Sequence, residues 1–210
     1  MTLQASQLAY SRGNRQLFDG LDFEVRPGEA LRVAGRNGSG KTSLLRVLSG
    51  LAEPVSGEVQ WHGQSIRSLR EDFSQDLIYV GHGSGIKDDF TACENVQISA
   101  ALSGRQCSAD QACEALNLLG LQGRAHLPAR VLSQGQRRRV VLARLAIKPA
   151  ARLAILDEPF NALDQESINV LSALLSHRLA EGAVVVYTTH QPQPLVASRT
   201  HEIHLDDGTA

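Results

Sequence analysis

The segment from Gly35 to Thr42 constrains the fold more than any other part of the 210-residue chain. It reads Gly35-Arg36-Asn37-Gly38-Ser39-Gly40-Lys41-Thr42 and matches the pattern GxxxxGK[ST] of a phosphate-binding loop. The glycines let backbone N–H groups converge on an anion at the positive end of the following helix. Lys41 can reach the β- and γ-phosphates of a nucleotide, and Thr42 can offer its hydroxyl to Mg²⁺. The pattern therefore predicts a strand, an anion-binding loop and a helix in this order.

Two adjacent acids follow an apolar run later in the chain. The run Leu153-Ala154-Ile155-Leu156-Asp157-Glu158 predicts a buried strand that ends in two carboxylates. At the tip of a strand, Asp157 suits a Mg²⁺ ligand, directly or through water. Glu158 is then placed to act as general base on an attacking water. Two acids after a strand are ordinarily solvated, so this interpretation depends on the phosphate-binding loop. The pair of patterns is typical of many nucleotide-hydrolysing proteins.

The order of the apolar segments predicts an α/β fold. We expect strands at Leu17–Val25, Ala30–Ala34 and Gly57–Trp61, a helix at Lys41–Ser49, and mostly helix over residues 91–148. The rest predicts strand Leu153–Leu156, helix Gln165–Ala180, strand Val184–Thr188 and a last strand His201–Leu205. Strands that alternate with helices indicate a mainly parallel sheet covered on both faces. The helical insertion predicts a domain with two lobes.

Charge and composition exclude several classes of protein. The formal net charge of −1 leaves no excess of positive charge for a nucleic-acid backbone. Arg137–Arg139 is a local basic run within an apolar periodic stretch, and we expect it on a solvated or anion-facing side of a helix. No run approaches the ~18 apolar residues of a membrane span, and the first residues do not resemble a signal peptide. Cys93, Cys107 and Cys113 lack CxxC spacing, which favours reduced thiols in the cytoplasm.

The segment Leu132-Ser133-Gln134-Gly135-Gln136 lies between these two motifs, before a helical pattern. It resembles the LSGGQ signature of the ABC ATPase family, with Gln134 at the variable site. The resemblance implies one ABC nucleotide-binding domain over residues 1–210, with a parallel core sheet, an N-terminal antiparallel β part and a helical subdomain at about 91–148. It also implies that the loop from Gly35 to Ser43 binds ATP with Mg²⁺. Ser133 and Gly135 would serve the γ-phosphate of ATP held by the opposite subunit.

Three shorter segments agree with this resemblance. Asn161-Ala162-Leu163-Asp164 resembles the D-loop, although Ser is commoner at the first position. Thr188-Thr189-His190 resembles the switch segment, which implies that His190 binds the γ-phosphate and orients the water in catalysis. Tyr10 lies 25 residues before Gly35, where the family places an aromatic that stacks on adenine. A partly buried strand tyrosine is the alternative for Tyr10.

His82 departs from the family pattern, because it stands where the Q-loop glutamine is expected. Its contact with Mg²⁺ and with the attacking water is therefore open, and a surface histidine without a role is the alternative. The surrounding run, Gly81-His82…Gly85-Ile86-Lys87…Thr91-Ala92-Cys93-Glu94-Asn95, resembles the ATP-binding subunits of cytochrome c maturation. Phe160 and the ending His190-Gln191-Pro192 agree with that group.

This second resemblance implies a pathway, a location and partners. The chain would work at the cytoplasmic side of a bacterial inner membrane, as a head-to-tail dimer bound peripherally. Its partners would be a transmembrane permease subunit and a haem-handling membrane protein, with no nucleic acid. ATP hydrolysis would power haem export or release of the haem-loaded chaperone. The sequence has no CxxCH motif and its seven histidines are scattered, so we expect no haem ligand in it.

Three other functions make their own predictions about the sequence. Soluble ABC ATPases of DNA repair or translation predict tandem cassettes, long insertions or a basic surface, and none of these features is found in the sequence. Another ABC importer or exporter stays open as an alternative, because only the segment around His82 and the short chain argue against it. A non-hydrolysing scaffold would be expected to lose Lys41 or Glu158, and both are present.

Overall fold

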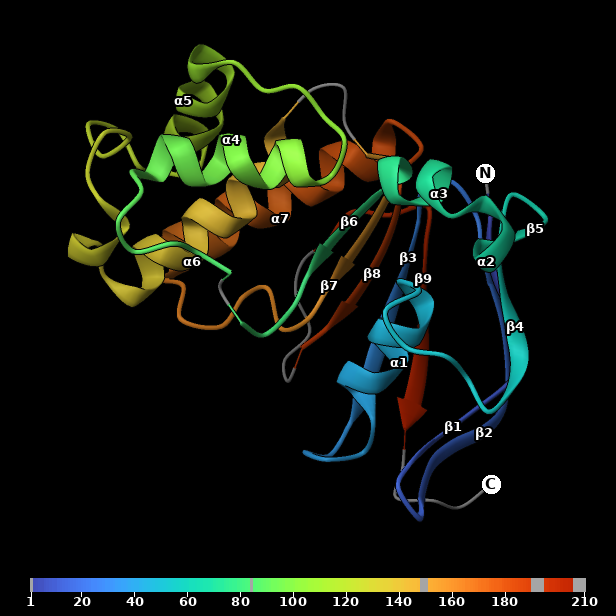
Figure 1. Ribbon diagram of the computed structural model, residues 1–210. Helices are drawn as coiled ribbons and strands as arrows, with labels where there is room; N and C mark the ends of the chain where they lie inside the picture. Colours follow the sequence, from blue (N-terminus) through green and yellow to red (C-terminus); the bar gives the residue numbers. More distant parts are fainter. Residues whose placement is uncertain (1, 84, 148–150, 190–194, 206–210) are drawn as a thin grey trace.

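The computed structural model describes residues 2–83, 85–147, 151–189 and 195–205, arranged as two β-sheets and a group of helices (Figure 1). In chain order the elements are β1 (Leu3–Arg12), β2 (Arg15–Val25), β3 (Glu29–Gly35), α1 (Lys41–Leu48), β4 (Ser56–Trp61), β5 (Gln64–Ser65), α2 (Ile66–Leu69), α3 (Glu71–Asp76), β6 (Leu77–Val80), α4 (Ala92–Leu102), α5 (Ala109–Leu118), α6 (Gln134–Leu142), β7 (Leu153–Leu156), α7 (Gln165–Ala180), β8 (Val184–Thr188) and β9 (Arg199–Leu205). Short 3-10 turns cover Ala129–Val131 and Ala143–Ala146.

The central sheet is parallel and has the strand order β6-β7-β8-β3-β9. Both of its faces are buried, and successive side chains of β7 and β8 point to opposite sides. Leu153 and Ile155 pack in the cluster that contains Leu44 of α1, whereas Ala154 packs in the cluster that contains Leu171 of α7. The apolar runs of these strands are thus explained by helices on both faces. The predicted mainly parallel sheet is confirmed.

An antiparallel sheet with the order β2-β1-β4-β5 covers α1 from the side opposite the central sheet (Figure 1). The sequence did not predict β1, because its alternation is broken by a bulge at Gln7, whose φ is +48°. Gly57 lies against this bulge, and a Cβ on it would stand 2.2 Å from the Gln7 carbonyl oxygen. Only glycine fits there. The predicted N-terminal antiparallel part is confirmed.

Helices α4, α5 and α6 form a lobe beside the central sheet, and their apolar side chains pack in the same cluster as one face of that sheet (Figure 1). Each of these helices begins with a capping box, in which the N-cap hydroxyl and the side chain three residues later bond reciprocally to the backbone. The caps are Thr91, Ser108 and Ser133. Among the described residues, no helix is long and apolar enough to cross a membrane. The boundaries of a helical subdomain at about 91–148 stay a prediction.

Candidate active site

The phosphate-binding loop joins the end of β3 to the start of α1, as predicted. Gly35 has a φ of +141°, and a Cβ on it would stand 2.4 Å from the Leu205 carbonyl oxygen and 2.6 Å from Ser39 Oγ. Gly40, the N-cap of α1, has a φ of +104° and lies against Leu17. A side chain at either glycine would therefore distort the loop. These close contacts therefore favour glycine at both positions, and the close approach of a phosphate to the backbone is a second reason.

Lys41 and Ser39 show that the loop suits an anionic ligand. The Lys41 side chain curls over its own loop, and Nζ donates to the carbonyl oxygens of Gly35 at 2.7 Å and Arg36 at 2.9 Å. Ser39 Oγ is buried and has no hydrogen-bond partner among the described residues. Phosphate oxygens would accept hydrogen bonds from both groups and from the backbone N–H groups of the loop. The donor set therefore fits the phosphates of ATP.

Asp157 and Thr42 lie together at the end of β7. Thr42 Oγ1 donates to Asp157 Oδ2 at 2.7 Å, and Thr188 Oγ1 donates to Asp157 Oδ1 at 2.8 Å. Asp157 is only 2% exposed, so its carboxylate is satisfied by these hydroxyls. A hydroxyl and a carboxylate at this separation are the oxygen ligands that Mg²⁺ prefers. The predicted metal pair is therefore assembled, and the residues fit Mg²⁺.

Glu158 has a backbone conformation that few residues other than glycine adopt, with a φ of +48°. Its N–H donates to Thr188 Oγ1 at 2.7 Å. Asn161 Nδ2 donates to the Glu158 carboxylate. Strained backbone of this kind persists only where the surroundings hold it. Glu158 is partly exposed in this turn, whereas the neighbouring Asp157 stays buried.

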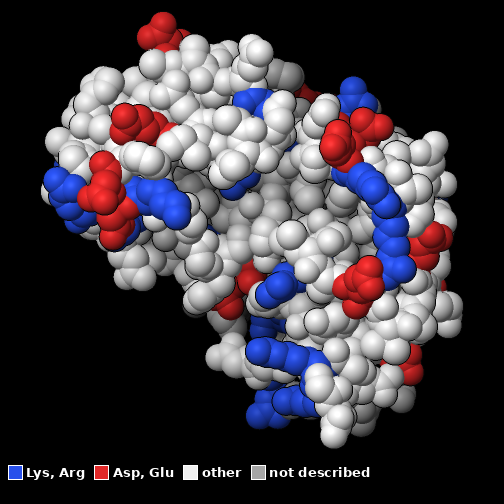
Figure 2. Space-filling model, viewed as in Figure 1, with Lys and Arg blue, Asp and Glu red and all other residues white. Residues whose placement is uncertain are grey.

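Two cavities meet at Glu158 and His82. One, of about 620 Å³, is lined by the phosphate-binding loop together with Arg12 and Arg15 of the β1–β2 turn. The other, of about 440 Å³, lies between α6 and the turn that contains Asn161. Both volumes are typical of small-molecule sites. Figure 2 shows lysine and arginine side chains gathered at the lower end of the molecule, where Figure 1 places this loop and turn.

The signature segment lies at the start of α6, away from the first cavity. Ser133 is the N-cap, and its Oγ accepts from the Gln136 N–H at 3.3 Å. A Cβ on Gly135 would stand 2.7 Å from the Ala162 carbonyl oxygen, so the turn after β7 crosses closely over this glycine. Neither Ser133 nor Gly135 lines the 620 Å³ cavity. This placement agrees with the prediction that they act on nucleotide held by another subunit.

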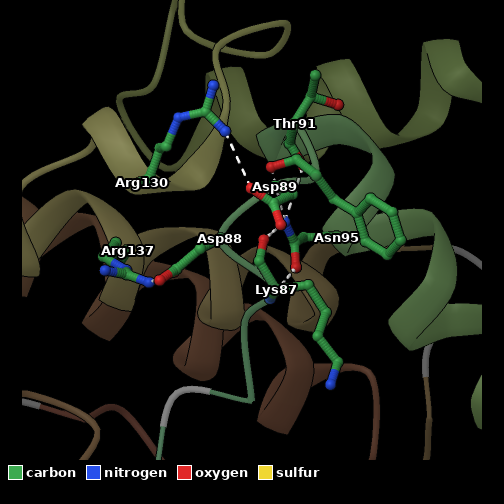
Figure 3. Close-up of polar contacts among 8 residues, drawn as sticks. Lys87, Asp88, Asp89, Thr91, Asn95, Arg130 and Arg137 are labelled. Carbon is green, nitrogen blue, oxygen red and sulfur yellow. Dashed lines mark hydrogen bonds and ion pairs between the residues drawn. The ribbon is translucent and has the colours of Figure 1, made fainter.

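The loop after β6 wraps around the buried side chain of Asn95 (Figure 3). Asn95 Oδ1 accepts from the Lys87 N–H at 2.8 Å, and Nδ2 donates to the carbonyl oxygens of Lys87, Phe90 and Thr91. Asp88 pairs with Arg137 of α6. The loop is thus tied to α4 by one amide and to α6 by an ion pair. Asp89 pairs in addition with Arg130 at 3.0 Å.

Arg138 is buried, and the expectation that the whole basic run is solvated or anion-facing is wrong at this residue. Its Nη2 donates to the carbonyl oxygens of Asp157 at 2.8 Å and Glu158 at 3.0 Å. Its Nη1 donates to the Gly81 carbonyl oxygen at 3.1 Å. Burial lowers the pKa of the Arg138 guanidinium, and the charges of Asp157 and Glu158 oppose this shift. Arg137 is partly exposed, as expected.

The structure does not test two of the predicted site residues. Tyr10 is half-buried in β1 and stacks on Phe18, with ring centroids 5.9 Å apart. It is not among the residues that line the 620 Å³ cavity, so adenine stacking by Tyr10 stays a prediction. His190 lies outside the described residues, and its role stays a prediction too.

The sequence analysis missed several residues that the structure brings to the site. These are Arg12, Arg15, Asn95 and Arg138. A usable signal existed for Asn95 and Arg138, because each is a polar residue on the apolar side of a helical pattern. Such a residue needs a buried partner. The partners of Asn95 are backbone groups of the preceding loop, whereas those of Arg138 belong to turns far along the chain, which no local pattern reveals.

Comparison with known proteins gives the class that this fold and site define. The chain belongs to the ABC transporter family, whose sequence model matches residues 18–161. It is 50% identical to the cytochrome c biogenesis ATP-binding export protein CcmA of Nitrosomonas europaea, over 97% of this chain and 95% of that protein. It is 45% identical to the protein of the same name from Pseudomonas aeruginosa, over 94% of this chain and 97% of that one. Both resemblances stated from the sequence are confirmed.

Solved structures show the same fold. An ABC transporter ATP-binding protein from Pyrococcus furiosus has a TM-score of 0.82 at 21% identity, and the match covers 96% of this chain and 97% of that one. A dimeric ATP-binding cassette bound to ADP and Pi has a TM-score of 0.79 at 24% identity, with 90% and 88% covered. The predictions of the ABC ATPase fold and of an ABC-type ATPase are confirmed.

Proposed function

We propose that this chain is the ATP-hydrolysing subunit of a membrane ABC complex in cytochrome c biogenesis. Its hydrolysis powers haem export or release of the haem-loaded chaperone. The observation that carries the proposal is the assembly of Lys41, Thr42 and Glu158 around one cavity of about 620 Å³. The similarity of nearly the whole chain to proteins named for cytochrome c biogenesis and ATP-binding export supports the pathway.

The chemistry follows from the positions of the side chains. Lys41 leaves its loop carbonyls for the β- and γ-phosphates and stabilises the negative charge that develops there. Thr42 and Asp157 would hold Mg²⁺, directly or through water, and the ion would supply positive charge next to the phosphate oxygens. Glu158 accepts a proton from the attacking water. Asp157 does not compete for this role, because two threonine hydroxyls bind its oxygens in the interior.

A second copy of the chain completes the site in this account. Ser133 and Gly135 lie at the N-terminus of α6, where backbone N–H groups and the helix dipole favour an anion. They do not line the 620 Å³ cavity of their own chain, and a head-to-tail dimer would bring them to the γ-phosphate of the opposite chain. The dimeric ATP-binding cassette of similar fold supports this arrangement.

The partners and the location are part of the proposal. The chain works at the cytoplasmic side of the bacterial inner membrane, bound to a transmembrane permease subunit and to a haem-handling membrane protein. No described helix could itself cross the membrane, and the net charge of −1 gives no support for a nucleic-acid partner. The alternative is the ATP-binding subunit of another ABC importer or exporter.

Co-purification from membranes tests the proposal against this alternative. A tagged full-length chain is solubilised with its complex in mild detergent, and the bound subunits are identified by mass spectrometry. We expect a multi-span permease subunit together with a membrane protein that carries haem. Recovery of a permease for another solute, without a haem-handling protein, would contradict the pathway and favour the alternative.

A further inference from the structure

Arg138 joins three parts of the chain through one buried guanidinium. It lies on α6, five residues after the signature Ser133. Its three acceptors are the carbonyl oxygens of Gly81, Asp157 and Glu158, at 2.8 to 3.1 Å. Gly81 immediately precedes His82, and Asp157 and Glu158 are the predicted metal ligand and base. These acceptors lie just after the neighbouring parallel strands β6 and β7.

The carbonyl of Glu158 belongs to a strained turn, so its position depends on what holds it. The φ of +48° is unfavourable for a glutamate by about 1–3 kcal/mol. The N–H of Glu158 donates to Thr188, and the carbonyl oxygen of Glu158 accepts from Arg138. A charged donor forms stronger hydrogen bonds than a neutral one, more so in a site with little water. Loss of Arg138 would therefore release one side of the turn.

A second contact ties the same helix to the same turn. The Ala162 carbonyl lies so close to Gly135 that no side chain fits between them. The N-terminal half of α6 thus contacts the segment after β7 at two places, once through Gly135 and once through Arg138. A third link joins α6 to the loop after β6, because Arg137 of α6 pairs with Asp88 of that loop (Figure 3). A shift of α6 along its axis must therefore displace Glu158 and the His82 loop.

We propose that Arg138 is a positioning residue that couples the two nucleotide sites of the dimer. It transmits the position of the signature helix to the catalytic turn of the same chain. Contact of Ser133 with ATP of the opposite subunit then sets the position of Glu158 at the chain's own ATP. The proposal rests on the proposed head-to-tail dimer. It assigns to Arg138 an effect on turnover and none on the binding of nucleotide to the phosphate-binding loop.

Arg139 is a matched control on the same helix. Its Nη1 also donates to two backbone carbonyls, those of Leu119 and Gly120, at 3.4 and 3.1 Å. These carbonyls lie at the C-terminal end of α5, in the helical lobe, and not in the catalytic turn. Arg139→Gln removes the same number of charges and atoms as Arg138→Gln. A general loss of packing in α6 would affect both variants alike.

The test is a double-mutant cycle on the full-length chain. ATP affinity, kcat and melting temperature are measured for Arg138→Gln, Arg138→Lys, Arg139→Gln, Ser133→Ala and the double variant of Ser133→Ala with Arg138→Gln. For Arg138→Gln we expect kcat to fall on the order of 10- to 100-fold, with ATP affinity within about twofold of wild type. Arg138→Lys keeps the charge and should recover part of the rate. If Arg138→Gln has a much lower melting temperature than wild type, the kcat of Arg138→Lys is compared with that of Arg139→Gln instead. Ser133→Ala should slow the wild type but add little to Arg138→Gln, since the connection is already lost.

Two results would overturn the coupling. The first is an Arg138→Gln protein whose kcat and affinity match those of Arg139→Gln. The second is a cycle in which the effects of Ser133→Ala and Arg138→Gln multiply, which would show that the residues act independently. Failure of the dimeric site has a different signature, because Ser133→Ala would then leave the rate of the otherwise wild-type chain unchanged.

Discussion

At the residue scale, two adjacent carboxylates have been given different surroundings. Asp157 is buried to 2% exposure and accepts hydrogen bonds from two threonine hydroxyls. Glu158 lies in a turn with a positive φ, is partly exposed and borders two cavities. Because a general base must reach a water molecule and a metal ligand must stay fixed, the two environments match the two proposed roles. The structure thus gives a physical reason for the two roles that the sequence predicts for Asp157 and Glu158.

Replacing Glu158 by Gln should remove the base and keep its shape. We expect kcat for ATP to fall by about 10²- to 10⁴-fold, while ATP still binds and accumulates in an ATP-bound dimer. Steady-state hydrolysis and size-exclusion chromatography with ATP and Mg²⁺ would measure both effects. Glu166→Gln, an exposed change in the first turn of α7, is the control. Hydrolysis at the wild-type rate by Glu158→Gln would show that the base has been assigned to the wrong residue.

His82 should affect coupling to the membrane partner more than nucleotide binding. It borders both cavities, whereas phosphate affinity comes from Lys41 and the loop around it. His82→Ala should leave ATP affinity within about twofold and lower partner-stimulated hydrolysis on the order of tenfold. His82→Gln, which restores the family pattern, should recover stimulation. A large loss of affinity with normal stimulation in His82→Ala would refute this role.

At the element scale, the loop after β6 depends on α4 for its shape. One amide side chain, Asn95, makes four hydrogen bonds to the backbone of residues 87–91. Ion pairs from Asp88 and Asp89 then attach the loop to the signature region. Residues 87–91 are therefore held between α4 and α6 by these contacts, and Arg138 binds the carbonyl oxygen of Gly81, just before His82. Movement of the helical lobe would carry this loop with it.

Asn95→Ala should destabilise the protein and disorder this loop. The change leaves the Lys87 N–H without its partner and removes one of two donors from the carbonyl oxygens of Lys87, Phe90 and Thr91. We therefore expect a loss of about 1–3 kcal/mol in the free energy of unfolding. Chemical denaturation would measure it, and hydrogen exchange should increase over residues 87–91. Asn117→Ala, at an exposed position near the end of α5, is the control. Equal stability of the two variants would contradict the role given to Asn95.

The predictions from sequence succeeded where one short segment carries the whole signal. The bounds of α7 and β8 agree with those predicted, because long apolar periodicity and a run of β-branched residues are local features. Helices α2 and α3 were not predicted, since helices of four and six residues show little periodicity. In the site, the phosphate-binding loop and Asp157 were found because they form contiguous motifs. Arg138 was misjudged because its partners are backbone carbonyls more than 18 residues away.

At the scale of the whole molecule, the chain has two lobes joined around one site. The sheets and α1 supply Lys41, Thr42 and Asp157, and the helical lobe supplies Ser133 and Arg138 (Figure 1). The ATP of one chain would thus be served by the sheet lobe of that chain and the helical lobe of another. Work on a membrane partner then follows from changes in the relative position of the lobes. In the proposed function, the machinery for hydrolysis lies in this chain, and the path for haem would lie in its membrane partners.

Cytochrome c maturation should require ATP hydrolysis that depends on Lys41, and a strain that carries only a Lys41 variant tests this directly. Lys41→Ala removes the charge that meets the phosphates, which should lower the rate on the order of 10²-fold or more. Haem staining of membrane and periplasmic fractions from cells that carry only this variant should show no covalently bound c-type haem. The b-type haem proteins should stay normal, and the haem chaperone should accumulate in its loaded form. Normal c-type cytochromes in this strain would contradict the maturation function and leave a transport ATPase for another substrate.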